Sequence, residues 1–298
     1  MIKIGHQRFL ALTFQIFSHP HGKEMITPKK RILIASFTLA SILLATQSVA
    51  EGGRYYVGIF GGGGSTSTTS VQQTGTAFYA PPKPVNAQGT APASAASMAG
   101  AHAGYEWDEF ALGAEQSGWG LRPAVEIEGF YLGNNPSATI VSPSTPGVAN
   151  HTFQATLPNN NGVFVANAVF ALKTPLSESI LPYAGAGVGG ATMNISSATS
   201  EQLNPAEPGL NHFNTNPNAS GSALAVNAKL GIRGELIDRI SLFAEYRYVY
   251  LGSTGYTFGQ TQGAGSNCCP NHVPTSNWNV NMGAQNYFLG VAGIQYRF

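Results

Sequence analysis

The feature that most constrains the fold of this chain is a two-residue alternation of apolar with polar or small residues. Within 240–251, the charged residues Glu245 and Arg247 share one parity, and the other parity is apolar, aromatic or small. Because successive side chains of a strand point to opposite faces, both charges would lie on one face. The segment is also long enough to cross a membrane as a tilted strand, which takes about 9–11 residues.

Seven further segments are predicted to be strands of the same kind. They are 54–62, 96–107, 121–132, 162–172, 181–194, 222–234 and 286–298. Two of them, 54–62 and 181–194, are too rich in glycine for their faces to be assigned. The terminal strand, Tyr287–Phe298, carries apolar residues on one face, and its polar residues Gln295 and Arg297 share the other.

The connections between these strands alternate between long and short. The long ones are 65–95, 133–161, 195–221 and 252–285, and the short ones are 108–120, 173–180 and 235–239. Membrane barrels have short turns at one end and longer loops at the other. The sequence therefore predicts an all-β, eight-stranded antiparallel up-and-down transmembrane barrel with four long external loops. The alternative, a soluble β sandwich, would not require this rhythm and should carry a more charged solvent face.

The amino-terminal region predicts export. A basic stretch ending at Arg31 precedes an apolar run over 32–44, and Ser48, Val49 and Ala50 form a small-residue cleavage site. We interpret 25–50 as a secretory signal peptide cut after Ala50, with an uncleaved anchor as the alternative. With residues 1–24 included, the region before the apolar run would be unusually long for a signal peptide, so we expect translation to begin at Met25.

Charge argues against one class of partner. Residues 1–50 hold six basic residues and one acidic residue of the chain's 15 and 14, so residues 51–298 carry a net charge of about −4 with neutral histidines. A nucleic-acid-binding protein should present a basic face. We therefore expect no nucleic-acid partner, and a single outer-membrane barrel domain over 51–298.

Two strands and the carboxyl terminus resemble a known family. The run from Leu181 to Gly189, the run from Phe243 to Tyr248 and the terminal Phe298 are similar to strands of the OmpA-type barrel and opacity-like surface antigen superfamily. The resemblance implies a Gram-negative outer-membrane location, with Tyr296 and Phe298 as the signal for the outer-membrane assembly machinery. Members are surface antigens, adhesins, envelope-stabilising proteins or narrow porin-like channels. We expect the barrel alone, without the peptidoglycan-binding domain that follows it in some members.

The inward parity predicts a polar network inside the barrel. Its members are Glu106, Arg122, Glu126, Glu128, Lys229, Arg233, Glu245, Arg247 and Arg297. The interior of an eight-stranded barrel is just wide enough for side chains to fill. Four carboxylates and five cations could pair there as a structural network, with an ion or proton path as the alternative.

Catalytic and cofactor sites are not indicated. Glu126 and Glu128 could act as an acid and base, and His102 invites a hydrolase hypothesis, but no motif supplies their partners. The four histidines after residue 50 lack metal-ligand spacing, so we expect no metal and no cofactor. Adjacent Cys268 and Cys269 leave three alternatives open, namely a vicinal disulfide, an intermolecular bridge or two free thiols.

The long loops are the expected place of function, because exposed connections on a rigid scaffold commonly carry binding residues. Their only charged residues are Lys83, Glu201 and Glu207. We expect a non-enzymatic outer-membrane surface protein, in contact with membrane lipid, whose loops bind host or envelope ligands. The alternatives are a narrow porin-like channel and, third, an outer-membrane hydrolase.

Overall fold

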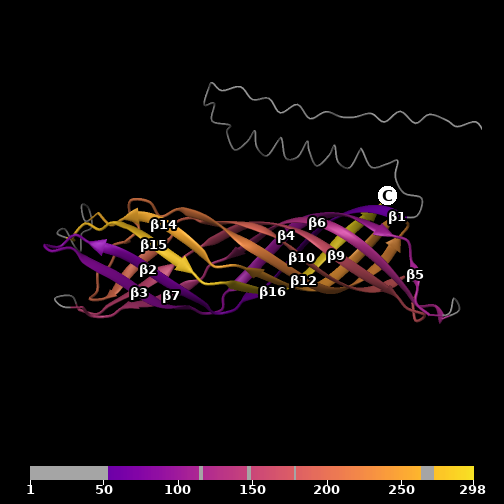
Figure 1. Ribbon diagram of the computed structural model, residues 1–298, viewed down its shortest axis with the longest axis horizontal. Coiled ribbons are helices and arrows are strands. Elements are labelled where there is room, and N and C mark those ends of the chain that lie inside the picture. Colours follow the sequence, from indigo (N-terminus) through magenta and orange to yellow (C-terminus); the bar gives the residue numbers. More distant parts are fainter. Residues whose placement is uncertain (1–52, 114–116, 146–148, 178, 263–271) are drawn as a thin grey trace, which may run out of the picture. The chain divides into compact units, whose positions relative to one another are not determined.

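The computed structural model (Figure 1) describes five stretches of the chain. They are residues 53–113, 117–145, 149–177, 179–262 and 272–298. The predicted signal peptide, the upstream residues 1–24 and the pair Cys268 and Cys269 lie outside these stretches. Within them, no helix is long and apolar enough to cross a membrane.

Eight long strands form a closed barrel. They are β1 (Gly53–Thr66), β4 (Ala95–Trp107), β6 (Gly120–Asn134), β9 (Asn159–Lys173), β10 (Ile180–Ile195), β12 (Ala219–Ile237), β13 (Ile240–Leu251) and β16 (Gln285–Arg297). Each strand pairs antiparallel with the next one along the chain, and β16 pairs with β1. The predicted eight-stranded up-and-down barrel is confirmed.

The alternation of the sequence follows the two faces of the barrel wall. Arg247 of β13 lies opposite Lys229 of β12, and both side chains are buried inside. Their neighbours Tyr246 and Leu230 point outward and are 56% and 64% exposed. The same outward face carries Ile59, Val125, Ile127, Phe164, Phe170, Val188, Leu224, Ile232, Leu242, Phe288 and Ile294. An apolar exterior around a polar interior is the arrangement of an outer-membrane-type barrel.

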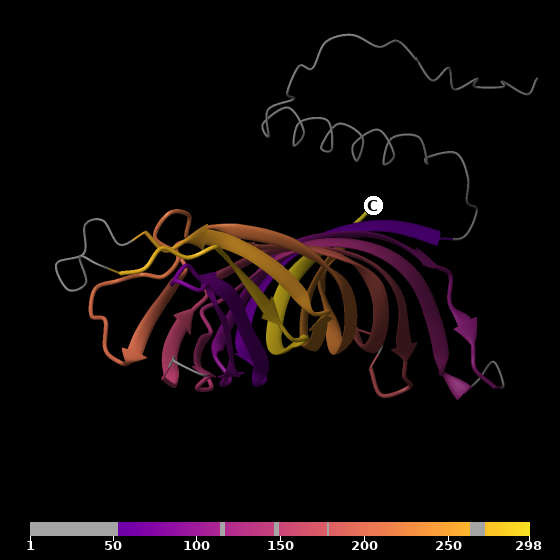
Figure 2. The same cartoon turned by 60° about the vertical axis from the view of Figure 1, so that its left-hand side comes forward.

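The long connections, predicted only as long external loops, contain regular structure. They contain seven shorter strands: β2 (Thr69–Ala77), β3 (Lys83–Ala91), β7 (Ser137–Ser142), β8 (His151–Thr156), β11 (Thr199–Asn204), β14 (Thr254–Gln260) and β15 (Asn277–Met282). These strands form a second sheet in the order β11-β8-β7-β3-β2-β15-β14. Figures 1 and 2 show them beyond the barrel strands, at the end opposite the short connections. The short connection after β4 holds β5 (Phe110–Ala111).

The two edges of the second sheet are joined by the segment 205–218. On one side, the His212 amide donates to the Ser200 carbonyl of β11 at 2.8 Å. On the other side, the Gly259 amide of β14 donates to the Asn216 carbonyl at 2.9 Å. We call the seven strands together with this segment the extension. Its backbone edges are thus largely paired, which leaves few open edge groups for unspecific strand addition.

The interior of the extension is mostly apolar, although the hydrogen-bonded pair Gln73 and Ser200 is also buried. Phe153, Tyr256, Phe258 and Trp278 are buried there, and Phe213 from the joining segment stacks on Phe258 with ring centroids 4.4 Å apart. The indole nitrogen of Trp278 also has a partner, because Nε1 donates a hydrogen bond to Thr261 Oγ1 at 3.0 Å. The extension is therefore a packed body in its own right.

Candidate functional site

Arg247 lies at the centre of a charged cluster inside the barrel. Its Nη1 and Nη2 donate to the two carboxylate oxygens of Glu128 at 2.8 and 3.1 Å. Its Nε donates to Glu245 Oε1 at 2.8 Å. The guanidinium carbon also lies 4.6 Å from the ring centroid of Phe60 and 5.6 Å from that of Phe130. The arginine is thus held by two carboxylates and by cation–π contacts with two rings.

Lys229 extends this cluster to a third carboxylate. Its Nζ donates to Glu128 Oε1 at 2.7 Å and also to Glu126. The Tyr56 hydroxyl donates to Glu126 Oε2 at 2.9 Å. The Tyr183 hydroxyl donates to Glu245 Oε2 at 2.7 Å. Each buried carboxylate therefore has a cationic partner and at least one further hydrogen bond, which buried charges require. We call Glu126, Glu128, Lys229, Glu245 and Arg247 the central cluster.

Three further predicted residues lie toward the short connections. Arg233 Nη2 donates to Glu106 Oε2 at 2.6 Å, and Arg297 Nη2 lies 3.7 Å from Glu106 Oε1. Arg297 also donates to Glu235 Oε1 at 2.9 Å. Sequence reasoning missed Glu235, although it precedes the shortest turn and shares the parity of Arg233.

The prediction that Arg122 belongs to the polar network is wrong, because this residue lies outside the buried network. Its Nη2 donates to Glu109 Oε2 at 3.0 Å, and the Lys173 Nζ lies 3.3 Å from the other oxygen of that carboxylate. Glu109 belongs to the short connection after β4, and the two paired side chains are 23% and 28% exposed. Arg122 has the inward parity, but its position near the start of β6 places it at the solvent-accessible mouth.

His102, on which the hydrolase hypothesis depends, is buried inside the barrel. Its ring is buried among Tyr56, Phe60 and Phe243, with centroid distances of 5.5–5.9 Å. Neither ring nitrogen has a hydrogen-bond partner within the described residues. Glu126 and Glu128 lie near it, but both carboxylates are already paired with the central cluster. The residues around His102 therefore supply no nucleophile–base–acid arrangement for a hydrolase.

The barrel interior is filled rather than open. A cavity of about 20 Å³ lies beside the central cluster, next to His102 and Gln295. A larger cavity of about 270 Å³ lies at the short-connection mouth, lined by Glu106, Glu109 and Arg122. The smaller cavity has room for about one water molecule. The charged cluster therefore occupies most of the cross-section, as expected for a barrel of eight strands.

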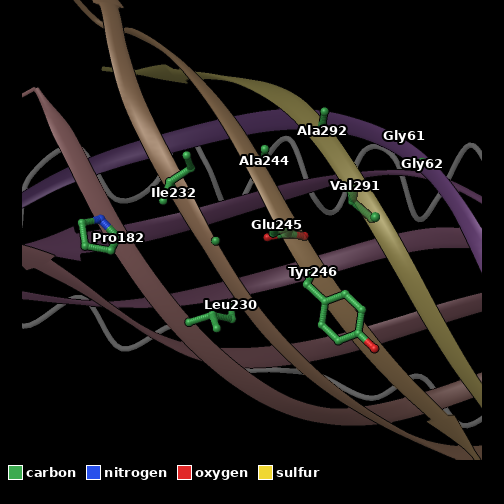
Figure 3. Close-up of a pocket in the computed structure, with 12 residues that line it drawn as sticks. Gly61, Gly62, Pro182, Leu230, Ile232, Ala244, Glu245, Tyr246, Val291 and Ala292 are labelled. Atoms are coloured by element: carbon green, nitrogen blue, oxygen red, sulfur yellow. The ribbon is translucent and has the colours of Figure 1, made fainter.

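A wide hollow lies on the outer wall, where small residues sit between large ones. Figure 3 shows its lining, which runs from Leu230 and Ile232 on β12 across Ala244 and Tyr246 on β13 to Ala292 on β16. Its volume is about 900 Å³, and it is open to the surroundings. Because its exposed lining is mostly apolar, we interpret it as part of the lipid-facing surface.

The residues predicted as the assembly signal lie at the end of β16. Tyr296 and Phe298 are 39% and 62% exposed, and their rings contact edge to face at a centroid distance of 5.2 Å. The Phe298 amide donates to the Tyr55 carbonyl at 2.9 Å, so β1 holds the terminal residue. Whether the assembly machinery reads these residues stays a prediction.

The outer end of the extension holds a further cluster of titratable groups. The tips of the long connections meet there around a cavity of about 50 Å³, lined by Tyr79, Thr145, Glu207, His212 and His272 among others. His212 Nε2 and His272 Nε2 lie 3.5 and 3.4 Å from Glu207 Oε2. We call these last three residues the mouth triad.

His212 is held in one orientation and in one tautomer. Its Nδ1 lies 3.0 Å from the Ser200 carbonyl oxygen, which can only accept, so Nδ1 carries the hydrogen. Burial lowers the pKa of His212 to about 4, against the opposing effect of this hydrogen bond, so the ring is neutral at pH 7. The Nε2 lone pair therefore points toward Glu207. Trp278 and Phe153 contact the ring edge to face at 6.0 and 5.2 Å.

The spacing of the histidines concealed this cluster from the sequence. Glu207 and His212 lie in the connection between β10 and β12, whereas His272 lies 60 residues later in the connection before β16. Only the pairing of the extension brings the two connections together. The one available signal was that Glu207 is one of three charged residues in all four long connections.

Comparisons with known proteins return structures of low similarity. No protein-family model and no curated protein matches the chain. The outer membrane protease OmpT from Escherichia coli is 8% identical with a TM-score of 0.37, over 85% of this chain and 100% of that one. Neisserial surface protein A is 14% identical with a TM-score of 0.30, over 83% and 100%. The outer membrane protein OprG from Pseudomonas aeruginosa is 14% identical with a TM-score of 0.32, over 83% and 96%.

Proposed function

We propose that this chain is a non-enzymatic surface protein of a bacterial outer membrane that binds partners through its extension. The observation that carries this proposal is the construction of the extension. All four long connections contribute backbone to one packed body that continues the barrel outward. A scaffold that holds its outer connections rigid presents a fixed binding surface at low entropic cost.

The outward face of the extension indicates the chemistry of such partners. Asn86, Gln72 and Gln88 form a hydrogen-bonded amide row across β2 and β3, and Thr257 donates to Asn279 across β14 and β15. Lys83 and Glu201 are the charged residues of the extension outside the mouth triad. A surface of amides and hydroxyls suits glycans or protein surfaces that are read by hydrogen bonds, and it offers little electrostatic attraction.

A narrow channel is the second candidate, and the 270 Å³ cavity at the short-connection mouth favours it. Beyond that cavity, a solute would have to pass the central cluster and then the apolar interior of the extension. Both are filled by buried side chains, among them Arg247 and Trp278, which are 0% and 1% exposed. Structural support of the barrel is the better account of the charges.

Replacing one hairpin of the extension tests the binding role. We would exchange 70–90, which covers most of β2 and β3, for a short Asn-Gly turn and compare adhesion of cells displaying either protein to host-cell monolayers and to immobilised glycans. We expect the truncated protein to keep the heat-modifiable gel shift of a folded barrel and to lose at least tenfold in adhesion.

The matched control is Tyr246→Leu, which changes only the lipid-facing wall and should leave adhesion unchanged. Equal adhesion of the truncated and intact proteins at equal surface density would contradict the binding role. Solute uptake into vesicles that contain the intact protein would favour the channel instead.

A further inference from the structure

We propose that the mouth triad, Glu207, His212 and His272, binds one zinc ion at the outer end of the extension. This inference goes beyond the proposed surface role, which requires no metal. It rests on three separate observations, namely the spacing of the donor atoms, their unsatisfied hydrogen bonding and the cavity beside them.

The spacing of the donors matches tetrahedral coordination. Zinc binds histidine nitrogens at about 2.0–2.1 Å and carboxylate oxygens at about 2.0–2.2 Å, which places neighbouring ligand atoms about 3.4 Å apart. Glu207 Oε2 lies 3.5 Å from His212 Nε2 and 3.4 Å from His272 Nε2. The three donors lie within 4.8 Å of one another. One ion could therefore contact all three side chains with only small movements.

The hydrogen bonding of the triad is incomplete without a cation. The Ser200 carbonyl accepts a hydrogen bond from His212 Nδ1, which leaves Nε2 as the ring atom that faces the Glu207 carboxylate. Glu207 Oε2 is buried and accepts no hydrogen bond from any described residue. A buried carboxylate oxygen without a donor is unfavourable, because it does not regain the hydrogen bonds that it makes in water. A metal ion would satisfy this oxygen, and the Ser200 contact is the orienting partner that metal-bound histidines usually have.

A second histidine–carboxylate group, inside the barrel, lacks these properties. His102, Glu126 and Glu128 also bring donors within 4.8 Å of one another. Their carboxylates, however, are bonded to Lys229 and Arg247, which already supply the positive charge. We therefore assign the metal to the mouth triad.

The fourth coordination position would face the cavity. Two histidines and one glutamate are the ligand set of zinc sites that keep one position open. The adjoining cavity of about 50 Å³ is large enough to hold a water molecule there. The ion would also cross-link the connections between β10 and β12 and between β13 and β16, which hydrogen bonds and the stacking of Phe213 on Phe258 already join.

Zinc titration of the untagged, metal-stripped protein in lipid nanodiscs tests the site. We expect calorimetry to show one zinc ion per chain, and Glu207→Gln and His272→Ala each to weaken binding at least tenfold. Cobalt(II) added in place of zinc should give the intense visible absorption of a tetrahedral site in the wild type, and this absorption should be lost in both variants. Calcium and magnesium, which prefer all-oxygen sites, should not compete.

Two controls separate this site from others. His151→Ala removes a histidine that lines the same cavity but lies outside the triad, and it should bind zinc as the wild type does. The double variant Cys268→Ser/Cys269→Ser should also retain binding. The proposal is wrong if the wild type binds no zinc, if Glu207→Gln and His272→Ala bind it unchanged, or if the cysteine variant loses it. Should His272→Ala fail to fold, the nearly isosteric Glu207→Gln decides.

Discussion

Arg247 shows how a fully buried cation can be accommodated in a barrel wall. The side chain is 0% exposed and makes two hydrogen bonds each to Glu128 and Glu245. Taking such groups from water costs several kcal/mol per ion, and the mutual attraction roughly offsets this cost only when every partner is present. The contribution of Arg247 to stability thus depends on its partners, because removal of one member of the central cluster leaves an uncompensated buried charge.

We therefore expect Arg247→Met to lower the free energy of unfolding by about 3–5 kcal/mol. The double variant Arg247→Met/Glu245→Gln should recover a large part of this loss, because Glu128 keeps Lys229 as its partner. Urea titration in detergent micelles, followed by tryptophan fluorescence, measures both values. The control is Arg122→Met, whose exposed ion pair should contribute at most about 1 kcal/mol. A double variant as unstable as the single one would show that the charges are not coupled.

At the scale of elements, the sequence predicted the eight barrel strands but not the extension. The barrel strands are 12–19 residues long, so alternation such as that around Glu245 is repeated often enough to be recognised. The strands of the extension have only 6–9 residues, and most of their polar residues are serine, threonine, asparagine or glutamine, which are equally common in loops. One signal was present, since Trp278, Val280 and Met282 alternate with asparagines over the whole of β15.

Individual site residues could also be predicted only in part from the sequence. Parity gives the direction of a side chain but not its depth along the barrel axis. Arg122 and Arg247 both have inward parity, yet only Arg247 is buried in the centre. The mouth triad could not be predicted from the sequence, because it forms only when connections far apart in the sequence pair with each other.

Trp278→Ala should unfold the extension without unfolding the barrel. The indole is buried in the core of the extension, and Gly75 of β2 lies so close that an added Cβ would be 2.7 Å from Cε3 of the ring. Loss of so large a side chain costs about 3–5 kcal/mol. Hydrogen exchange should become faster in β2, β14 and β15, whereas the barrel strands keep their protection.

The matched control for this variant is Asn277→Ala, an exposed neighbour in the same strand. It should leave hydrogen exchange in β2 and β14 close to that of the wild type. Equal loss of protection in barrel and extension after Trp278→Ala would show that the two sheets unfold as one unit.

At the scale of the whole described part, Gly53–Phe298, the polar and apolar interiors are stacked along one axis. The central cluster fills the barrel, and the layer above it is made of neutral polar groups, such as the Tyr287 hydroxyl, which lies within hydrogen-bond distance of the amide oxygens of Asn134 and Gln285. Beyond that layer lies the apolar core of the extension. Two different barriers to permeation are therefore in series, one electrostatic and packed, the other apolar.

Because two barriers lie in series, we expect the wild-type protein to conduct no ions. We also expect a change to only one of the barriers to leave it non-conducting. In planar bilayers the wild type should show no stepwise current, because ions can cross neither the filled charged layer nor the apolar core. Shortening the extension alone should leave the bilayer silent, since Arg247 and its partners still close the barrel. Arg247→Ala alone should also be silent, because the core around Trp278 still closes the outer end. Only the combination is expected to conduct, and an open porin inserted into the same bilayer serves as the positive control. Stepwise current from the wild type, altered by Arg247→Ala, would instead identify the charged layer as the selective part of a channel.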